Sequence, residues 1–324
     1  MKRYGFGVDL GGTTCKLGLF ETDGTLVEKW EIPTDTSEGG KAILPDIAAA
    51  ISRKATELKL GPEDVQGIGI GVPGAVNGEG VVNRCVNLGW GVVDVRSTLS
   101  DLTGFPVQVG NDANIAALGE AWMGAGKGYS SIVMVTLGTG VGGGIILNGK
   151  IWNGFDGAAG EMGHIRVNPQ ETVACSCGNK GCLEQYASAT GVVRVAKLRL
   201  AKAGLTNIWV PGKEGQPGIL REMKEDLTAK DVFDSAKAGV PIAAEIVKEV
   251  CTLLGSAIAT VCNVVNPEAV LIGGGVSKAG LILISSLEEG FHQSVFHACR
   301  NTKILLATLG NDAGIYGGVK MVLD

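Results

Sequence analysis

The amino-acid sequence predicts an α/β protein of two domains that share one duplicated α/β unit. The first observation is length, because 324 residues exceed what one hydrophobic core usually spans. The second is a repeated pattern in which a glycine turn joins two short apolar strands, at residues 8–11 and again at residues 135–138. The third is a later strand that ends in glycines, at residues 69–74 and 271–276. A chance likeness between glycine-rich strand ends is the alternative, and it stays open here.

In the first half, short apolar runs bounded by turn residues predict strands at residues 4–10, 16–20, 25–32, 65–72 and 107–109. The run at residues 65–72 is nearly continuous, which is typical of a strand buried on both faces. A helical pattern covers residues 41–60. A second helix is expected at residues 112–123, with Asn111 or Asp112 near its N-cap.

The second half opens with the same pattern. Strands are expected at residues 131–137 and 145–147, with a glycine turn at residues 138–144. The charge-free stretch between Lys127 and Lys150 is long enough to span a bilayer, but its glycines favour two buried strands. Three further elements are predicted: a polar surface insertion at residues 204–225, a long helix at residues 241–265 and a last short helix from Ala313.

Composition excludes several classes of protein. Hydrophobic residues make up 45% and charged residues 19% of the chain, an ordinary globular balance. The formal net charge is -5 and the basic residues are scattered, so neither a nucleic acid nor a membrane is the expected partner. Asp9 interrupts any apolar secretory core, so we expect a cytoplasmic protein whose eight cysteines form no disulfides.

Two glycine turns have the chemistry of a phosphate site. Both GxGxxG matches, at residues 69–74 and 138–143, lack the helix that a dinucleotide fingerprint requires immediately afterwards. The turns after Asp9 and after Leu137 instead present backbone N–H groups and threonine hydroxyls, and Asp9 could hold Mg²⁺ through water. The expected nucleotide-binding residues are Asp9, Gly11, Gly12, Thr13, Thr14, Gly138, Thr139, Gly140, Gly274 and Gly275. Two ordinary hairpins are the alternative.

A cysteine cluster predicts a metal site. Cys175, Cys177 and Cys182 follow a Cys-x-Cys-x₄-Cys pattern, and His164 lies eleven residues upstream. Three thiolates and one imidazole form a closed tetrahedral set, which is the composition of a structural Zn²⁺ site with no open position for catalytic water. The remaining cysteines are expected to be small buried hydrophobes: Cys15, Cys85, Cys251, Cys262 and Cys299.

Motifs along almost the whole chain resemble one family. They are Asp9-Leu10-Gly11-Gly12-Thr13, Gly71-Val72-Pro73-Gly74, Asn111-Asp112-Ala113-Asn114, Leu137-Gly138-Thr139-Gly140, Glu161-Met162-Gly163-His164 and the cysteine segment that ends at Leu183-Glu184. In this order they resemble the ROK family of sugar kinases and repressors, whose fold is shared with actin and hexokinase. Asn87-Leu88-Gly89-Trp90 further resembles its glucokinase branch.

The resemblance implies a two-domain actin-like (RNase H-like) ATPase fold with a cleft between the domains. The small α/β domain would comprise residues 1–115, completed by the C-terminal helix 312–324, and the larger domain residues 116–311, with the zinc loop at 164–182. It implies phosphorylation of glucose by ATP with Mg²⁺, Asp112 being the general base on the 6-hydroxyl, in a homodimer or homotetramer. The expected substrate-binding residues are Gly74, Asn87, Asn111, Asp112, Glu161, His164 and Glu184.

Other functions remain open. The sugar could be another hexose or an N-acetylhexosamine, such as N-acetylmannosamine, N-acetylglucosamine, fructose or allose, and the donor could be polyphosphate. A sugar-responsive repressor is less expected, because such repressors carry an added N-terminal DNA-binding region and the first phosphate turn here begins at Asp9. For single residues the structural alternatives are a helix N-cap for Asp112 and solvated carboxylates for Glu161 and Glu184.

Overall fold

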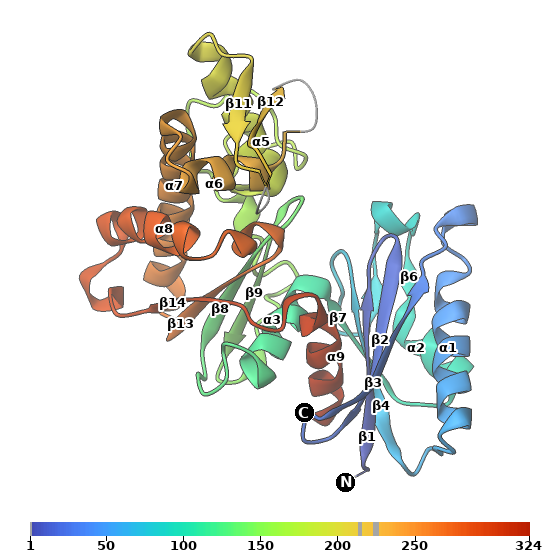
Figure 1. The fold of residues 1–324 in the computed structure, drawn as a ribbon. Coiled ribbons are helices and arrows are strands. Elements are labelled where there is room, and N and C mark those ends of the chain that lie inside the picture. The colour runs from blue at the N-terminus through green and yellow to red at the C-terminus, as the bar shows by residue number, and fades with distance from the viewer. Residues whose placement is uncertain (1, 213–215, 223–226) are drawn as a thin grey trace. The chain divides into compact units, whose positions relative to one another are not determined.

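A computed structural model describes residues 2–212, 216–222 and 227–324 of the chain. It forms two compact units (Figure 1). The first comprises Met1–Val133, Gly144–Gly160 and Thr308–Asp324, and the second comprises Met134–Gly143 and Glu161–Ala307. The C-terminal helix groups with the first unit. The first unit also takes residues 116–133, whereas the larger domain was expected to begin at residue 116.

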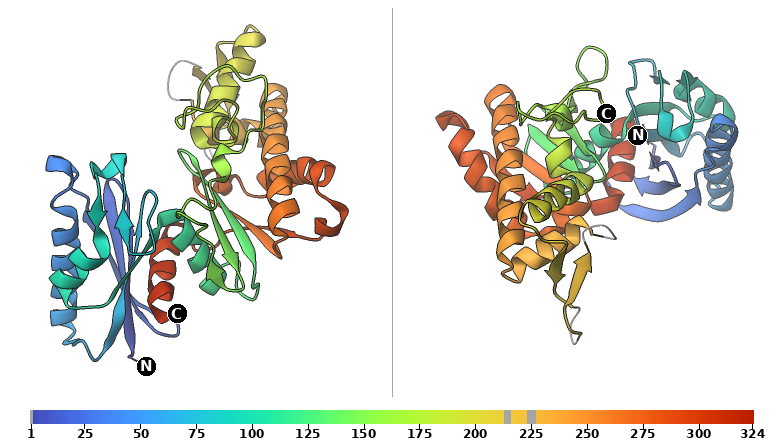
Figure 2. Two further views of the ribbon diagram at one scale, coloured as in Figure 1. Left: turned by 180° about the vertical axis from the view of Figure 1, so that it is seen from behind. Right: turned by 90° about the horizontal axis from the view of Figure 1, so that it is seen from above.

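A five-stranded sheet forms the centre of the first unit. Its order is β3-β2-β1-β4-β7, in which β1, β4 and β7 are parallel and β2 and β3 are antiparallel to their neighbours. These strands are β1 Tyr4–Leu10, β2 Thr14–Glu21, β3 Leu26–Pro33, β4 Val65–Val72 and β7 Val107–Asn111. Helices α1 (Ile43–Glu57) and α2 (Val95–Thr103) cover one face, and α9 (Ala313–Leu323) covers the other (Figures 1 and 2).

Alternation along β1 explains the two different faces. Phe6, Val8 and Leu10 are buried in the core shared with α1 and α2. Glycines fill the opposite face, where α9 lies against the bare backbone. A Cβ on Gly7 would stand 1.9 Å from the carbonyl oxygen of Ile315. Helix α9 can therefore approach the sheet only because these strand positions lack side chains.

The second sheet repeats the strand order of the first. Its order is β10-β9-β8-β13-β14, with the strands β8 Ile132–Leu137, β9 Val141–Leu147, β10 Lys150–Ile151, β13 Ala269–Gly273 and β14 Lys303–Leu306. In each sheet the central strand is the one that comes first in the sequence, β1 or β8. The next two strands along the chain lie on one side of it, and two later strands lie on the other. The predicted duplication is confirmed, and the fold is the two-unit actin-like α/β type.

The remaining elements agree in part with prediction. The helices expected at residues 112–123 and 241–265 are confirmed as α3 (Asp112–Met123) and α7 (Pro241–Val265). The glycine turn expected at residues 138–144 is shorter, because β9 already begins at Val141. The other elements are β5 Val81–Val82, β6 Val93–Asp94, α4 Glu184–Ala187, α5 Ala189–Lys202, α6 Ala229–Lys237 and α8 Leu281–Ser294.

The predicted surface insertion holds a small two-stranded sheet. Strands β11 (Asn207–Val210) and β12 (Ile219–Glu222) pair antiparallel within it, and its residues 213–215 and 223–225 lie outside the described part. The five cysteines assigned to the interior are all buried. Among the described residues, no helix is both long and apolar enough to cross a membrane.

Candidate functional site

The parallel strands of the first unit bring three predicted site residues to one edge. Asp9 near the end of β1 pairs with Gly71 of β4, and Val72 of β4 pairs with Asn111 at the end of β7. Asp112 follows immediately as the first residue of α3. Carboxyl ends of parallel strands are where α/β sheets usually bind ligands, so this edge is a candidate active site.

The structure resolves which residue caps α3. The side-chain oxygen of Asn111 accepts the backbone N–H groups of Ala113 and Asn114 at 3.0 and 3.2 Å. The Asn111 side-chain amide also donates to the carbonyl oxygen of Gly74 at 3.1 Å. Asn111 is therefore the N-cap, and Asp112 lies one residue inside the helix. Capping does not account for the presence of an acid at position 112.

Asp9 is held in an unusual electrostatic environment. The pKa of its carboxyl group is raised to about 6, mainly because the group is buried; the nearby Asp112 also acts to raise the pKa, and Lys16 acts to lower it. Helix α9 approaches it at Gly314, where a Cβ would stand 2.6 Å from the carboxyl carbon of Asp9. A divalent cation would favour the ionised form, so the residue fits a role beside Mg²⁺.

The first glycine turn is partly exposed to solvent, and two hydrogen bonds hold its backbone. The Gly11 N–H donates to the Thr14 carbonyl oxygen at 3.1 Å, and the Thr34 hydroxyl donates to the Gly11 carbonyl oxygen at 2.8 Å. Gly12 and Thr13 are exposed. Asn87 is exposed too, and a Cβ on Gly12 would lie 3.7 Å from its carbonyl oxygen. The structure therefore places the predicted sugar residue Asn87 beside the predicted phosphate turn.

The second glycine turn lies in the second unit, against the end of β13. The Gly138 N–H donates to the Gly140 carbonyl oxygen at 3.0 Å, which closes a tight turn that leaves Thr139 exposed. Gly274 has a positive φ of 83°, and a Cβ there would lie 2.5 Å from the Leu137 carbonyl oxygen. Gly274 is thus required both by its conformation and by this close approach. The predicted turn residues Gly138–Gly140 and Gly274–Gly275 lie together.

The four predicted metal ligands form one cluster. Their ligand atoms all lie within 4.8 Å of one another: His164, Cys175, Cys177 and Cys182. The Cys177 and Cys182 sulfurs are 3.6 Å apart, and the Cys175 sulfur is 3.9 Å from His164 Nδ1. Two sulfurs bound at about 2.3 Å in a tetrahedron would be about 3.8 Å apart. The donor set and spacing therefore fit a tetrahedral metal ion.

Three polar side chains outside the ligand set lie beside this cluster: Glu161, Ser176 and Glu184. His164 Nε2 lies 3.9 Å from a carboxylate oxygen of Glu161, whose side chain is 62% exposed. Because His164 turns Nδ1 towards the sulfurs, Nε2 is the nitrogen left for hydrogen bonding. The Glu184 carboxylate accepts the Ser176 hydroxyl at 3.0 Å and the Val141 N–H at 3.1 Å. Glu184 is therefore an oriented carboxylate, not a freely solvated one.

Sequence reasoning missed several residues that support this site. Gly314 packs against Asp9, Thr34 holds the first turn, and Ser176 holds Glu184. Thr190 donates its hydroxyl to the Thr139 carbonyl oxygen at 2.8 Å and so holds the second turn. Only Ser176, which lies between two metal ligands, had a local signal. The others reach the site from distant parts of the chain.

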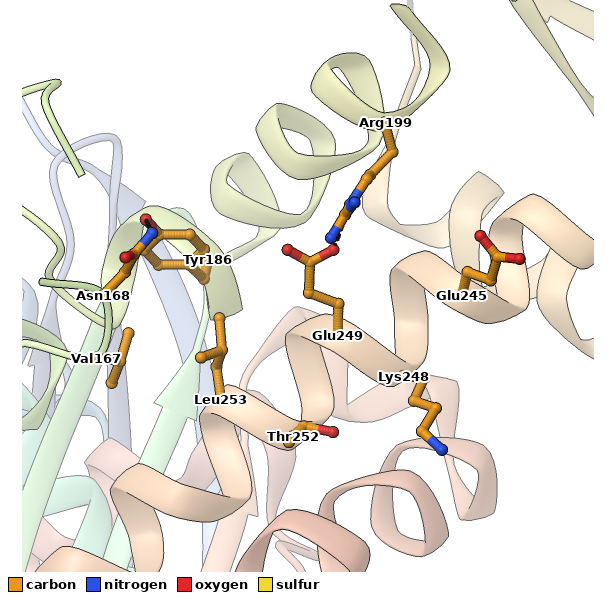
Figure 3. Close-up of a pocket in the computed structure, with 9 residues that line it drawn as sticks. All are labelled: Val167, Asn168, Tyr186, Arg199, Glu245, Lys248, Glu249, Thr252 and Leu253. Carbon is orange, nitrogen blue, oxygen red and sulfur yellow. Dashed lines mark hydrogen bonds and ion pairs between the residues drawn. The ribbon is translucent and has the colours of Figure 1, made fainter. Parts of the chain in front are cut away.

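A cavity of about 510 Å³ lies elsewhere in the second unit, on α5 and α7 (Figure 3). Its lining includes Tyr186, Asn168 and the Arg199–Glu249 ion pair, whose charged groups point at each other. It contains none of the predicted site residues. The candidate functional residues therefore remain those of the strand ends, the turns and the metal cluster, each described within its own unit.

Comparison with known proteins gives one consistent result. The model of the ROK family matches residues 5–324. A glucokinase from Halalkalibacterium halodurans is 44% identical over 98% of this chain and 94% of its own length. A glucokinase from Thermotoga maritima is 37% identical over 98% of this chain and 96% of its own. A solved ROK glucokinase from Streptomyces griseus, in complex with glucose and AMPPNP, matches with a TM-score of 0.74 and 31% identity, and 98% of each chain is covered.

Proposed function

The chain belongs to the ROK family, and we propose that it is an ATP-dependent glucokinase that converts glucose to glucose 6-phosphate. The observation that carries this function is the 44% identity to a curated glucokinase over nearly the whole chain. The placement of an acid, Asp112, at the carboxyl edge of the first sheet supports the same chemistry.

Asp112 is the proposed general base. Its carboxylate takes the proton from the glucose 6-hydroxyl while the oxygen forms a bond to the γ-phosphorus, and the bond from that phosphorus to the β,γ-bridging oxygen breaks. The capping of α3 by Asn111 supports this role, because Asp112 is then not required as the N-cap. Its backbone lies beside β4, since a Cβ on Gly71 would be in van der Waals contact with the Asp112 Cα at 3.5 Å.

Glucose recognition requires groups that accept and donate in fixed directions. We assign this role to Gly74, Asn87, Asn111, Glu161, His164 and Glu184. Glu184 and Asn111 support the assignment best, because each is oriented by two or more hydrogen bonds. Carboxylates at Glu161 and Glu184 would accept hydroxyl protons, and His164 Nε2 would complete the set.

The two glycine turns are the proposed phosphate sites. They comprise residues 11–14, 138–140 and 274–275, of which Gly12, Thr13, Thr139, Gly274 and Gly275 are exposed, and backbone N–H groups and threonine hydroxyls suit phosphate oxygens. Asp9 would hold the Mg²⁺ that accompanies ATP and neutralises charge on the phosphates. The raised pKa of Asp9 supports this, because the burial that disfavours its charge is offset once a cation is near.

Zn²⁺ is the proposed occupant of the cysteine cluster. The three sulfurs and His164 Nδ1 would hold it, and the ion would supply structural cross-linking of the loop, not Lewis acid chemistry. The loop carries Ser176 and leads directly into α4, whose first residue is Glu184. A fixed loop therefore orients a proposed sugar ligand.

A coupled ADP-release assay over a sugar panel tests the proposal. With ATP and Mg²⁺, glucose should give the highest kcat/KM among glucose, N-acetylmannosamine, N-acetylglucosamine, fructose and allose. Polyphosphate replaces ATP in a parallel arm. A higher kcat/KM for N-acetylmannosamine would overturn the glucose assignment, and no turnover with any sugar would favour a sugar-binding regulator.

The proposed assembly is a homodimer or homotetramer, by analogy with the family. Light scattering after size-exclusion chromatography measures the mass directly against the 33.3 kDa of one chain. A monomeric mass at working concentration would contradict it.

A further inference from the structure

One carboxylate links the metal loop to the second glycine turn. Oxygen Oε2 of Glu184 accepts the N–H of Val141, the residue directly after the turn at residues 138–140, at 3.1 Å. Oxygen Oε1 accepts the hydroxyl of Ser176 at 3.0 Å, and Ser176 lies between the proposed ligands Cys175 and Cys177. All of these groups belong to the second unit. Glu184 is thus a bridge between a proposed sugar site and a proposed phosphate site.

Glu184 lies in close contact with the second glycine turn. A Cβ on Gly140 would lie 2.4 Å from Oε2 of Glu184, so the turn packs directly against the carboxylate. The main chain that follows Glu184 is hydrogen-bonded to the same turn. The Ala189 N–H donates to the Gly138 carbonyl oxygen at 2.8 Å, and the Thr190 hydroxyl donates to the Thr139 carbonyl oxygen at 2.8 Å. A shift of the Glu184 carboxylate therefore changes the packing of the turn at Gly140.

A second contact ties the turn to the sugar side. A Cβ on Gly163 would lie 2.3 Å from the Val141 carbonyl oxygen. Gly163 belongs to the short segment that carries Glu161 and His164. Val141 thus donates its N–H to Glu184, and its carbonyl oxygen is in contact with the segment that carries His164.

We propose that Glu184 couples glucose binding to nucleotide binding, and that Ser176 is the positioning residue that sets the orientation of its carboxylate. The idea rests on the proposed function, since Glu184 must accept a sugar hydroxyl. An ionised carboxylate has about four acceptor positions, so the contacts with Val141, Ser176 and the Cys175 sulfur, 3.7 Å from Oε1, leave one position for a sugar hydroxyl. A bound hydroxyl then fixes the carboxylate, the carboxylate fixes the turn, and the turn amides are already in place when phosphate arrives. Linkage makes the effect reciprocal.

Calorimetry on the zinc-loaded full chain measures this coupling directly. The affinity for a non-hydrolysable ATP analogue is determined with and without saturating glucose, and the affinity for glucose with and without the analogue. In the wild type each ligand should tighten the other by about fivefold or more. Ser176→Ala should weaken glucose binding about 3- to 10-fold, since it removes one hydrogen bond to a charged acceptor at an exposed site. The coupling factor should fall towards one, while analogue affinity without glucose stays nearly unchanged.

Matched variants separate positioning from structural support. Ser176→Thr keeps the hydroxyl and should restore both glucose affinity and coupling. Ser285→Ala removes a hydroxyl that bonds to carbonyl oxygens of its own helix α8, so it should change neither quantity. Zinc content and melting temperature are measured for every variant. If Ser176→Ala loses zinc, Glu184→Gln decides, because it removes the charge of the bridge without removing a ligand.

Two results would overturn the inference: a wild-type coupling factor of one, or wild-type glucose affinity and coupling in folded, zinc-loaded Ser176→Ala or Glu184→Gln protein. If the wild type phosphorylates glucose normally, the second result would remove this inference and, for Glu184→Gln, the assignment of Glu184 as a glucose ligand, but it would leave the proposed glucokinase function in place. Absence of glucose phosphorylation in the wild type would remove the proposed function itself.

Discussion

Replacing Asp112 with Asn separates catalysis from helix capping. The N-cap of α3 is Asn111, so the helix keeps both of its capping hydrogen bonds in the variant. Asp112 itself accepts the Ala113 N–H at 2.8 Å, and the amide oxygen of asparagine can accept the same bond. The variant loses the negative charge, and with it the ability to take a proton.

The substitution should have a small effect on stability and a large effect on kcat. Loss of a negative charge in the first turn of a helix costs about 0.3–1 kcal/mol. Relief of the repulsion between Asp112 and Asp9 offsets part of that cost. The melting temperature should therefore fall by no more than about 4 °C. Loss of a general base should lower kcat about 10²- to 10⁴-fold, which corresponds to about 3–5 kcal/mol of transition-state stabilisation.

Three measurements on one preparation test this reasoning: kcat from ADP release, glucose affinity by calorimetry and the melting temperature. Asp94→Asn is the matched control, because Asp94 caps α2 in the same unit, accepts the Ser97 N–H and belongs to no proposed site. It should lose a little stability and no activity. Near-normal kcat in a folded, glucose-binding Asp112→Asn protein would refute the assignment of Asp112 as the base.

Three further changes have defined outcomes. Cys177→Ser should lose the metal and weaken glucose more than ATP binding; elemental analysis and calorimetry check this, and active wild type without zinc would contradict it. Gly314→Ala should raise the KM for MgATP, because a Cβ 2.6 Å from the Asp9 carboxyl carbon displaces that group, whereas an unchanged KM would argue against Asp9. Hydrogen bonds from the Val173 N–H, Tyr186 and Arg194 lower the pKa of Glu171 to about 2. Its ionised form therefore stabilises the fold above about pH 4.5, and this contribution is lost as the pH falls towards 2. Glu171→Gln should reduce the free energy of unfolding by about 1–3 kcal/mol at pH 7 and by less at pH 3, as urea titrations measure; equal losses at both pH values would contradict the cause.

Local sequence was enough where the determining interactions are local. The helices at Asp112–Met123 and Pro241–Val265 have the predicted bounds, because capping and proline signals lie within a few residues of their ends. The four metal ligands cluster as predicted, since the three cysteines lie within one short loop. Helix α6 was not predicted, although its capping box of Thr228 and Asp231 is a local signal.

Only the tertiary structure decided the contacts that orient the site. Asn111 and Asp112 are adjacent and both suited to cap a helix, and the fold gives the cap to Asn111. The Glu184 carboxylate accepts the N–H of Val141, which lies 43 positions earlier in the sequence. Gly314 meets Asp9 because α9 returns from the far end of the chain to lie on glycines of β1 and β4. Residue type and spacing show which groups have suitable chemistry. Which backbone amide a carboxylate meets depends on long-range packing, and no local pattern encodes that partner.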